Sequence, residues 1–312
     1  MANKKIMTLF NYIGGKTWLR NQLREEINKN LIGKKITTYV EPFAGGLGAF
    51  LGVYDILVEN KIKTVILNDI NSKLINFYKI VKNEHENLIN EYMKLELEYE
   101  KTIPLDSKLL HKTKDKIKLK LMLLNSELFY KKIRNKFNSN QSDLESAVSL
   151  LFLQNHCFNG IYRENLKGGY NTPFNWESKT FNEEKIREKI VAVNKVFNLF
   201  VIEFSNKSFV DLNYNNNSFY YLDPPYINDI NTNENKYNKD SFDIDKQKLL
   251  IKKIKGASFL YSNHDNDILI KEFEENNMSV NINKVSRKNI ISSSNESRKT
   301  DKIEILVSSK HN

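Results

Sequence analysis

Short apolar runs alternate with stretches of helical periodicity along most of the chain, and this alternation predicts an α/β fold with a mostly parallel sheet. The apolar runs predict strands at residues 37–40, 63–67, 199–204, 219–222, 257–262, 279–285 and 302–307. Apolar residues at helical spacing predict helices at residues 17–27, 74–81, 181–197, 243–254 and 265–275, and one from the turn at 41–48 to about residue 59.

Residues 83–153 interrupt the alternation, because this segment is helical in pattern throughout and rich in charge. Its basic runs at 112–120 and 130–136 are usually solvated faces, but an insertion in such a sheet is also a natural place for substrate recognition. Residues 155–176 then mix polar, aromatic and basic side chains with glycine, which favours a hairpin or loop that meets nucleic acid. The Asn-rich residues 227–240 and the Ser-rich residues 287–299 are predicted to be a mobile loop and a flexible hairpin tip.

The run Phe219–Leu222 leads directly into Asp223-Pro224-Pro225-Tyr226. A strand of only apolar and aromatic residues is typical of the centre of a parallel sheet, and two prolines end the pairing. Ligands bind at the carboxyl ends of such strands, so the turn is predicted to present a carboxylate, an aromatic face and backbone carbonyls at a binding site. Taken alone, the four residues are also compatible with a plain turn.

Two further segments suggest a nucleotide-type ligand. The turn Glu41–Gly48 joins a strand to a helix and is rich in glycine, which permits close approach of a ligand, and Asp69 ends the next strand where a ribose-binding carboxylate lies in such folds. The alternatives are glycines that only allow the turn and an aspartate that only caps a helix. Near the N-terminus, Tyr12 to Lys16 form a weaker signal with two glycines and a lysine, but not the phosphate-binding loop pattern.

The composition is permissive for a polyanionic partner, since the 312 residues carry a formal net charge of +10. An AT-rich coding sequence would give the same surplus of lysine. The single cysteine, Cys157, excludes an intrachain disulfide and a CxxC metal site. With neither a signal-peptide core nor a membrane span in the pattern, we expect a soluble intracellular protein with no membrane partner.

Taken in order, these segments resemble the Dam-type, D12 class of N6-adenine-specific DNA methyltransferases across nearly the whole chain. The resemblance rests on Tyr12–Lys16, Glu41–Gly46, Asn68–Asn71, the Phe158–Phe174 segment, Asp223–Tyr226 and Ser262–Asp265, with the 287–299 tip as a further family segment. It implies a Rossmann-like, S-adenosylmethionine-dependent sheet with an inserted, mainly helical DNA target-recognition domain. The catalytic domain would comprise residues 1–83 and 177–312, and the recognition domain residues 84–176.

The resemblance also implies roles for single residues. Asp223, Pro224, Pro225 and Tyr226 would be catalytic, and the cofactor, with S-adenosylhomocysteine as its product, would be held by Tyr12, Gly14, Lys16, Glu41, Pro42, Phe43, Ala44, Gly45, Asp69, Ser208, Phe209 and Asp223. Double-stranded DNA would be contacted by Asn11, Phe158, Asn159, Gly160, Ile161, Arg163, Asn165 and Pro173, with Phe158 as a wedge, Asn159 on a phosphate and Arg163 on a base edge.

The resemblance leaves several points open. Asn11 stands where some GATC-reading members have lysine, so the recognition sequence stays open, as do the oligomeric state and a cognate restriction endonuclease as partner. No metal is expected. Cys157 lacks the Pro-Cys context of a cytosine-C5 methyltransferase, and we interpret it as a small buried thiol and His264 as a cap or packing residue. The alternatives are a methyltransferase of RNA or protein that shares the Asp-Pro-Pro-Tyr turn, and a DNA-binding module without catalysis.

Overall fold

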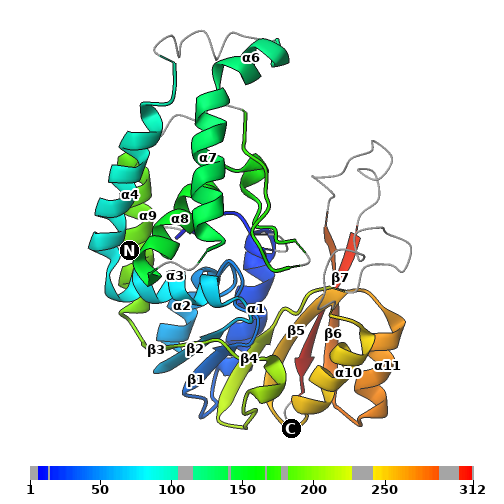
Figure 1. Ribbon diagram of the computed structural model, residues 1–312. Helices are drawn as coiled ribbons and strands as arrows, with labels where there is room; N and C mark the ends of the chain where they lie inside the picture. The colour runs from blue at the N-terminus through cyan, green and yellow to red at the C-terminus, as the bar shows by residue number, and fades with distance from the viewer. Residues whose placement is uncertain are drawn as a thin grey trace.

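Within the described residues, seven strands form one sheet in the order β3-β2-β1-β4-β5-β7-β6 (Figure 1). Strands β1 to β5 run parallel to one another, and β7 runs antiparallel to both β5 and β6. Their bounds are β1 Thr38–Glu41, β2 Thr64–Asn68, β3 Val201–Ser205, β4 Ser218–Leu222, β5 Ser258–His264, β6 Val280–Arg287 and β7 Lys302–Ser309. This computed structural model describes residues 6–12, 15–104, 115–139, 142–165, 167–176, 182–226, 242–287 and 302–310.

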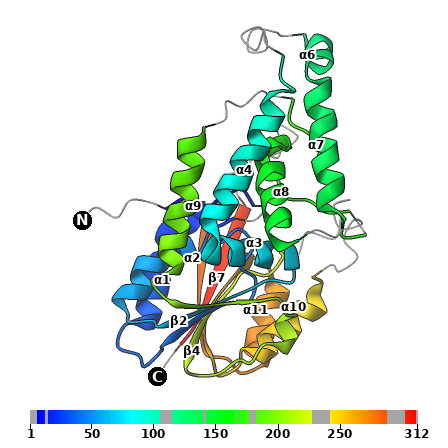
Figure 2. The ribbon, with the colours of Figure 1, turned by 60° about the vertical axis from the view of Figure 1, so that its left-hand side comes forward.

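Helices cover both faces of the sheet (Figures 1 and 2). One face packs against α1 (Arg20–Leu31), α2 (Phe50–Glu59), α3 (Ser72–Asn83) and α9 (Glu183–Phe197). The other face packs against α10 (Ile244–Lys253) and α11 (Asp267–Glu275). This double covering explains why β4 is buried at every position and carries no charged side chain between Ser218 and Asp223.

Strand β1 lies between β2 and β4, and this placement fixes the position of the site. From β1 the chain continues to β2 and β3 on one side, whereas β4 and β5 extend the sheet on the other. The carboxyl ends of β1 and β4 therefore meet where the strand order reverses, which is the ligand-binding crevice of open α/β sheets. Glu41 is the last residue of β1 and Asp223 is the first residue after β4.

The helical segment that interrupts the sheet contains α4 (His85–Glu100), α6 (Lys116–Met122), α7 (Leu124–Phe137) and α8 (Asp143–His156). It stands beyond the carboxyl ends of the parallel strands in Figure 1, and its buried aromatic residues belong to the same hydrophobic cluster as Tyr39 of β1. A capping box of Ser142 and Glu145 starts α8. The division of the chain into residues 1–83 with 177–312 and residues 84–176 stays a prediction.

The α/β fold class and each expected strand are confirmed, with boundaries shifted by one or two residues. One helix begins differently, because residues 17–19 form a short 3-10 turn, η1 (Thr17–Leu19), and α1 follows to Leu31. Two other short 3-10 turns are η2 (Phe158–Gly160) and η3 (Phe209–Asp211). The expected mobile loop (227–240) and nearly all of the hairpin tip (288–299) lie outside the described residues. Among the described helices, none is long and apolar enough to cross a membrane.

Candidate active site

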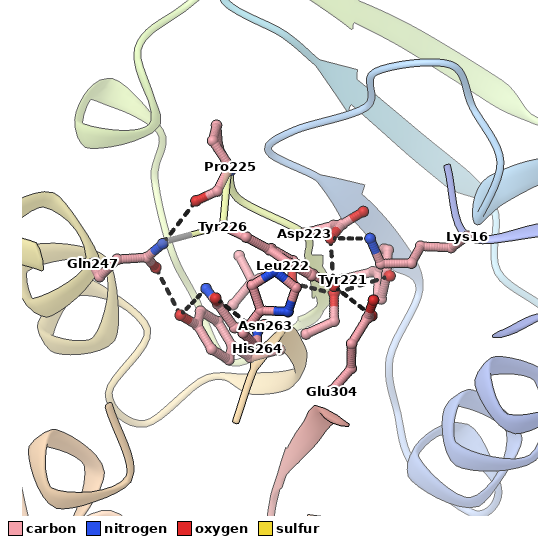
Figure 3. A network of polar contacts seen from close by, with 12 residues as sticks. Lys16, Tyr221, Leu222, Asp223, Pro225, Tyr226, Gln247, Asn263, His264 and Glu304 are labelled. Carbon is pink, nitrogen blue, oxygen red and sulfur yellow. Dashed lines mark hydrogen bonds and ion pairs between the residues drawn. The ribbon is translucent and has the colours of Figure 1, made fainter. Parts of the chain in front are cut away.

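The turn after β4 places the Asp223 carboxylate at the centre of a buried polar network (Figure 3). Lys16 Nζ lies 2.8 Å from Asp223 Oδ1, and Ser262 Oγ donates a hydrogen bond of 3.0 Å to the same oxygen. Ser262 belongs to β5, the neighbour of β4, so its position follows from the parallel pairing of the two strands. The Asp223 side chain is 19% exposed, whereas that of Lys16 is 3% exposed.

The electrostatics of this turn depend on burial and on one cation. Burial raises the pKa of Asp223, and the Lys16 ammonium and the Ser262 hydroxyl oppose that rise. The nearby Glu304 carboxylate raises the pKa further. Asp223 is therefore an acceptor whose ionisation relies on positive charge or N–H donors supplied nearby.

Tyr226 is held on three sides. Its hydroxyl donates to Glu304 Oε2 at 2.8 Å, its ring lies edge-on to the His264 ring with centroids 4.6 Å apart, and Lys16 Nζ lies 4.5 Å from its ring centroid. Glu304 is buried on β7, directly opposite His264 of β5 in the antiparallel register. The ring orientation of Tyr226 is thus set by a strand pair outside the turn.

The backbone of the turn is fixed from α10. Gln247 Nε2 donates to the Pro225 carbonyl at 2.9 Å, and Tyr261 Oη donates to Gln247 Oε1 at 2.7 Å (Figure 3). Asn263 Nδ2 in turn donates to Tyr261 Oη at 2.8 Å. Because the two prolines already restrict the backbone, this chain of bonds leaves the turn little freedom.

Asp69 organises the glycine-rich turn after β1. Its two carboxylate oxygens accept hydrogen bonds from the backbone N–H groups of Gly45 and Asn71, at 2.8 and 2.9 Å. The side chain that caps α3 is Asn71, which accepts from the N–H groups of Lys73 and Leu74. Asp69 is therefore not the cap of the helix, and burial raises its pKa.

Tyr12 lies directly over the glycine turn. A Cβ atom added to Gly46 would come within 2.6 Å of Tyr12 Cβ, and one added to Gly45 within 3.1 Å of Tyr12 Cε1. The tyrosine ring also stacks on Tyr162, with centroids 6.2 Å apart. Glycine is required at position 46 by this close approach, and Tyr12 links the turn to the segment containing Tyr162.

Glu41 is a buried carboxyl group next to the turn after β4. It accepts a hydrogen bond of 2.7 Å from the Tyr39 hydroxyl, and its side chain is 1% exposed. Burial raises the pKa of Glu41 to about 8, with a further contribution from the charge of Asp223. At neutral pH, Glu41 is consequently mostly protonated and able to donate as well as to accept.

The remaining residues of the glycine-rich turn after β1 border an aromatic cluster. Phe43 lies against Phe209 and Phe242, with ring centroids 5.8 and 5.4 Å apart, and Ser208 starts η3 just before Phe209. The Ala44 N–H donates to the Asn68 carbonyl at 2.8 Å, and Asn68 Nδ2 donates to the Pro42 carbonyl at 2.9 Å. These contacts bring the predicted cofactor residues of β1, β2 and η3 together.

Residues 155–176, predicted to form a hairpin or a loop, contain a hairpin, with antiparallel bridges between Cys157 and Phe174 and between Glu164 and Tyr170. Phe158 lies at the base of the hairpin and is 51% exposed, and its N–H donates to the Pro173 carbonyl at 2.9 Å. Asn159 and Gly160 follow with positive φ values of 57° and 66°. This backbone turns Phe158 outward, although apolar side chains of its size are usually buried.

Asn11 approaches the hairpin, since a Cβ atom on Gly160 would lie 3.2 Å from Asn11 Nδ2. Arg163 is exposed and donates from Nε to Asn171 Oδ1 at 2.8 Å. Asn165 has a structural contact instead of a free side chain, because its Oδ1 accepts from the N–H groups of Lys167 and Gly169. Ile161 is half-buried between these positions.

Sequence reasoning missed several contributors to the site. Lys16 was expected among the cofactor residues, but its contacts with Asp223 and Tyr226 were not expected. Ser262 and Glu304, which hold these two side chains, and Gln247, which fixes the turn, were missed altogether. A usable signal for Glu304 was its position as a lone charge before the apolar residues 305–307. Gly14 lies outside the described residues. Cys157 is buried, and in the described part of the chain no group of three or more His, Cys, Asp or Glu side chains could hold a metal ion.

Comparisons with known proteins agree with this arrangement. A family model described as D12 class N6 adenine-specific DNA methyltransferase matches residues 12–291. The chain is 32% identical to the Type II methyltransferase M.MjaIII of Methanocaldococcus jannaschii, over 97% of this chain and 99% of the relative. It is 27% identical to the DNA adenine methylase of Serratia marcescens (85% and 86% covered) and 28% identical to that of Escherichia coli K12 (84% and 82% covered).

Proposed function

The chain belongs to the D12 class of N6-adenine-specific DNA methyltransferases, and on that premise we propose that Asp223–Tyr226 bind a flipped-out adenine of double-stranded DNA for methylation at its amine. The observation that carries this proposal is the Asp223 carboxylate beside the Tyr226 ring, at the crevice between β1 and β4. A carboxylate next to an aromatic face suits a planar base that bears an amine.

The chemistry follows from the acceptors of the turn. The adenine amine is a poor nucleophile because its lone pair is delocalised into the ring, and the base must leave the duplex at a cost of a few kcal/mol. Tyr226 stacks on the base, and the Asp223 carboxylate and the Pro224 carbonyl accept the two N–H bonds. Accepting both hydrogens localises the lone pair on nitrogen and directs it, so the protein contributes positioning and electrostatics.

We propose that S-adenosylmethionine, which supplies an activated methyl group when bound, is held along the ends of β1, β2 and η3. The residues fit such a group, because the Tyr12 ring lies over the glycine-rich turn and Asp69 is a buried acid. Asp69 has lone pairs left for a ribose, Phe43 and Phe209 supply apolar faces, and Glu41 supplies a polar group. The other members of this proposed cofactor site are Gly14, Lys16, Pro42, Ala44, Ser208 and Asp223.

The hairpin is proposed to contact DNA. Phe158 is exposed where the hairpin begins, and its ring can wedge into the stacked bases of the duplex. Asn159 would contact a phosphate, and Arg163 would contact the edge of a nucleobase. Asn11 and Gly160 lie together beside it, while Ile161, Asn165 and Pro173 shape the hairpin. The type II names among the relatives favour a cognate restriction endonuclease as functional partner. A family that acts on DNA favours the cytoplasm as the compartment.

A transfer assay tests the proposal and separates it from the alternatives. The protein is incubated with methyl-tritiated S-adenosylmethionine in three parallel reactions. One contains genomic DNA lacking adenine methylation, one contains total RNA, and one contains a protein extract. We expect label in DNA alone, and nucleoside analysis should identify it as N6-methyladenine. Label in RNA or protein with none in DNA would contradict the proposal, and no label with any substrate would favour a DNA-binding module without catalysis.

A further inference from the structure

The Lys16 ammonium lies between the two groups that are proposed to receive the adenine. It is 2.8 Å from Asp223 Oδ1 and 4.5 Å from the centroid of the Tyr226 ring (Figure 3). An adenine that stacks on this face of Tyr226 and donates an amine proton to Asp223 Oδ1 needs the same position. That oxygen has two lone pairs and already accepts from Lys16 and Ser262, so the amine must replace one of these two donors.

The position of Lys16 is built into the fold. The Gly15 N–H donates to the Tyr12 carbonyl at 3.1 Å, and the Leu19 N–H donates to the Lys16 carbonyl at 3.0 Å, so the backbone around Lys16 is turned on both sides. The side chain is 3% exposed, and a buried ammonium is retained in proteins only where it is paired. Its carboxylate partner is the group on which the proposed chemistry depends.

We propose that Lys16 is a stand-in for the target amine: its ammonium occupies the amine acceptor of Asp223 in the free protein and is displaced when adenine enters. The inference rests on the proposed function and adds a role in the base pocket to the cofactor role that the family resemblance implies for Lys16. It gives the residue two effects. The cation keeps Asp223 ionised while the pocket holds no base, and it must be replaced by another N–H donor.

The second effect would select among bases. A base with an exocyclic amine replaces the ammonium as donor to the carboxylate, whereas a base with a carbonyl at that position leaves a buried carboxylate facing an oxygen. Lys16 therefore adds a penalty against the wrong base to the attraction for the correct one. This predicts that the pocket distinguishes adenosine from inosine, two nucleosides of nearly the same shape.

The first test observes Lys16 directly, without catalysis and without a known recognition site. The signal of its Nζ protons is recorded by NMR on the full chain labelled with ¹⁵N and is assigned by its loss in Lys16→Arg. Saturating S-adenosylhomocysteine keeps nucleosides out of the cofactor site. We expect adenosine to remove or shift the Lys16 signal and inosine to leave it unchanged, whereas equal effects of both, or no effect of adenosine, would overturn the proposal.

The second test uses Lys16→Met, which keeps the length of the side chain and removes the charge. Asp223 also faces Glu41, Glu304, Tyr221 and Tyr226, and none of these side chains carries a positive charge that could replace Lys16. In the variant, Asp223 takes up a proton more readily, so adenosine affinity should fall by about tenfold per pH unit below the pKa of Asp223. In the wild type the affinity should stay flat over the same range.

The control variant is Lys29→Met, which removes a lysine from an exposed ion pair on α1 and should behave as the wild type. A pH-independent loss of adenosine binding in Lys16→Met would show that the lysine holds the bound state, and would overturn the proposal. Identical pH profiles in the variant and the wild type would do so as well. A failure of the proposed function is distinguishable, because it appears as absent DNA methylation in a wild type whose Lys16 signal still separates adenosine from inosine.

Discussion

The turn after β4 and the hairpin at residues 157–174 are held in opposite ways. In the turn, the side chains of Asp223 and Tyr226 are fixed by contacts with other side chains. These are Lys16, Ser262 and Glu304, which come from other parts of the fold. In the hairpin, most of the hydrogen bonds involve the backbone, and Phe158 and Arg163 are exposed to solvent.

The difference corresponds to the two proposed tasks. Transfer of a methyl group needs reacting atoms held within narrow limits, and a buried network of satisfied polar groups provides this rigidity. Recognition of DNA needs donors and a wedge that can adapt to a bent or opened duplex, and exposed side chains on a fixed backbone provide this freedom. Changes in the turn should therefore affect rate and stability, and changes in the hairpin should affect site choice.

The largest effect is expected for Asp223→Ala. The variant loses the acceptor that orients the amine, and removal of one such electrostatic group costs roughly 10²–10³-fold in rate or more. Affinity for S-adenosylmethionine, measured by calorimetry, should stay largely intact, with exposed Asp245→Ala as the matched control. Full transfer activity in Asp223→Ala would break the mechanism.

Glu41 should make stability depend on pH. Its pKa of about 8 exceeds the ordinary 4.5, so between these values the folded protein holds a proton that the unfolded chain has released. The free energy of unfolding should then fall as pH rises, by up to ~1.4 kcal/mol per unit from this group. The free energy of unfolding is measured with urea between about pH 5 and pH 8, the range bounded by this pKa. Its slope against pH should be shallower in Glu41→Gln than in the wild type, and equal slopes would contradict the buried, protonated state.

Gly46→Ala tests the close approach of Tyr12. The new methyl group would lie 2.6 Å from Tyr12 Cβ, so the segment around Tyr12 must move, at a cost of roughly 1–3 kcal/mol. Thermal unfolding and cofactor affinity should both decrease. Gly52→Ala is the control, because its added Cβ atom would only meet Arg20 Cγ at 3.5 Å.

The smallest effect on the fold is expected for Arg163→Ala. Loss of a base contact should weaken or relax site choice by roughly 1–3 kcal/mol, while the melting temperature stays close to that of the wild type. Lys167→Ala, at the exposed tip of the same hairpin, should leave site choice unchanged. A methylation pattern that does not change in Arg163→Ala would argue against base recognition by this residue.

The sequence was sufficient for the sheet and the glycine turn, because burial on both faces and tight turns impose local patterns. Phe219–Leu222 consists of apolar and aromatic residues since helices cover both faces of β4, and Asp223 follows where the prolines end the strand. The Asp69 position was also predictable from its spacing to the glycines.

The partners of these residues were not predictable, because they meet only through the topology. Glu304 reaches Tyr226 after an antiparallel strand is added next to β5, and no local pattern in the sequence specifies this pairing. Lys16 follows two glycines, a context that suggests a ligand, whereas its partner Asp223 lies more than two hundred residues away. Long-range charge pairs of this kind require the fold.

Mapping of modified bases across a host genome tests the central claim most directly. The wild type and Asp223→Ala are expressed separately in a host without adenine methylation, and the DNA is read by single-molecule sequencing. The account predicts N6-methyladenine confined to one short motif with the wild type and none with Asp223→Ala. A folded wild type that binds S-adenosylmethionine and leaves no modified adenine, or an Asp223→Ala variant that methylates as the wild type does, would contradict it.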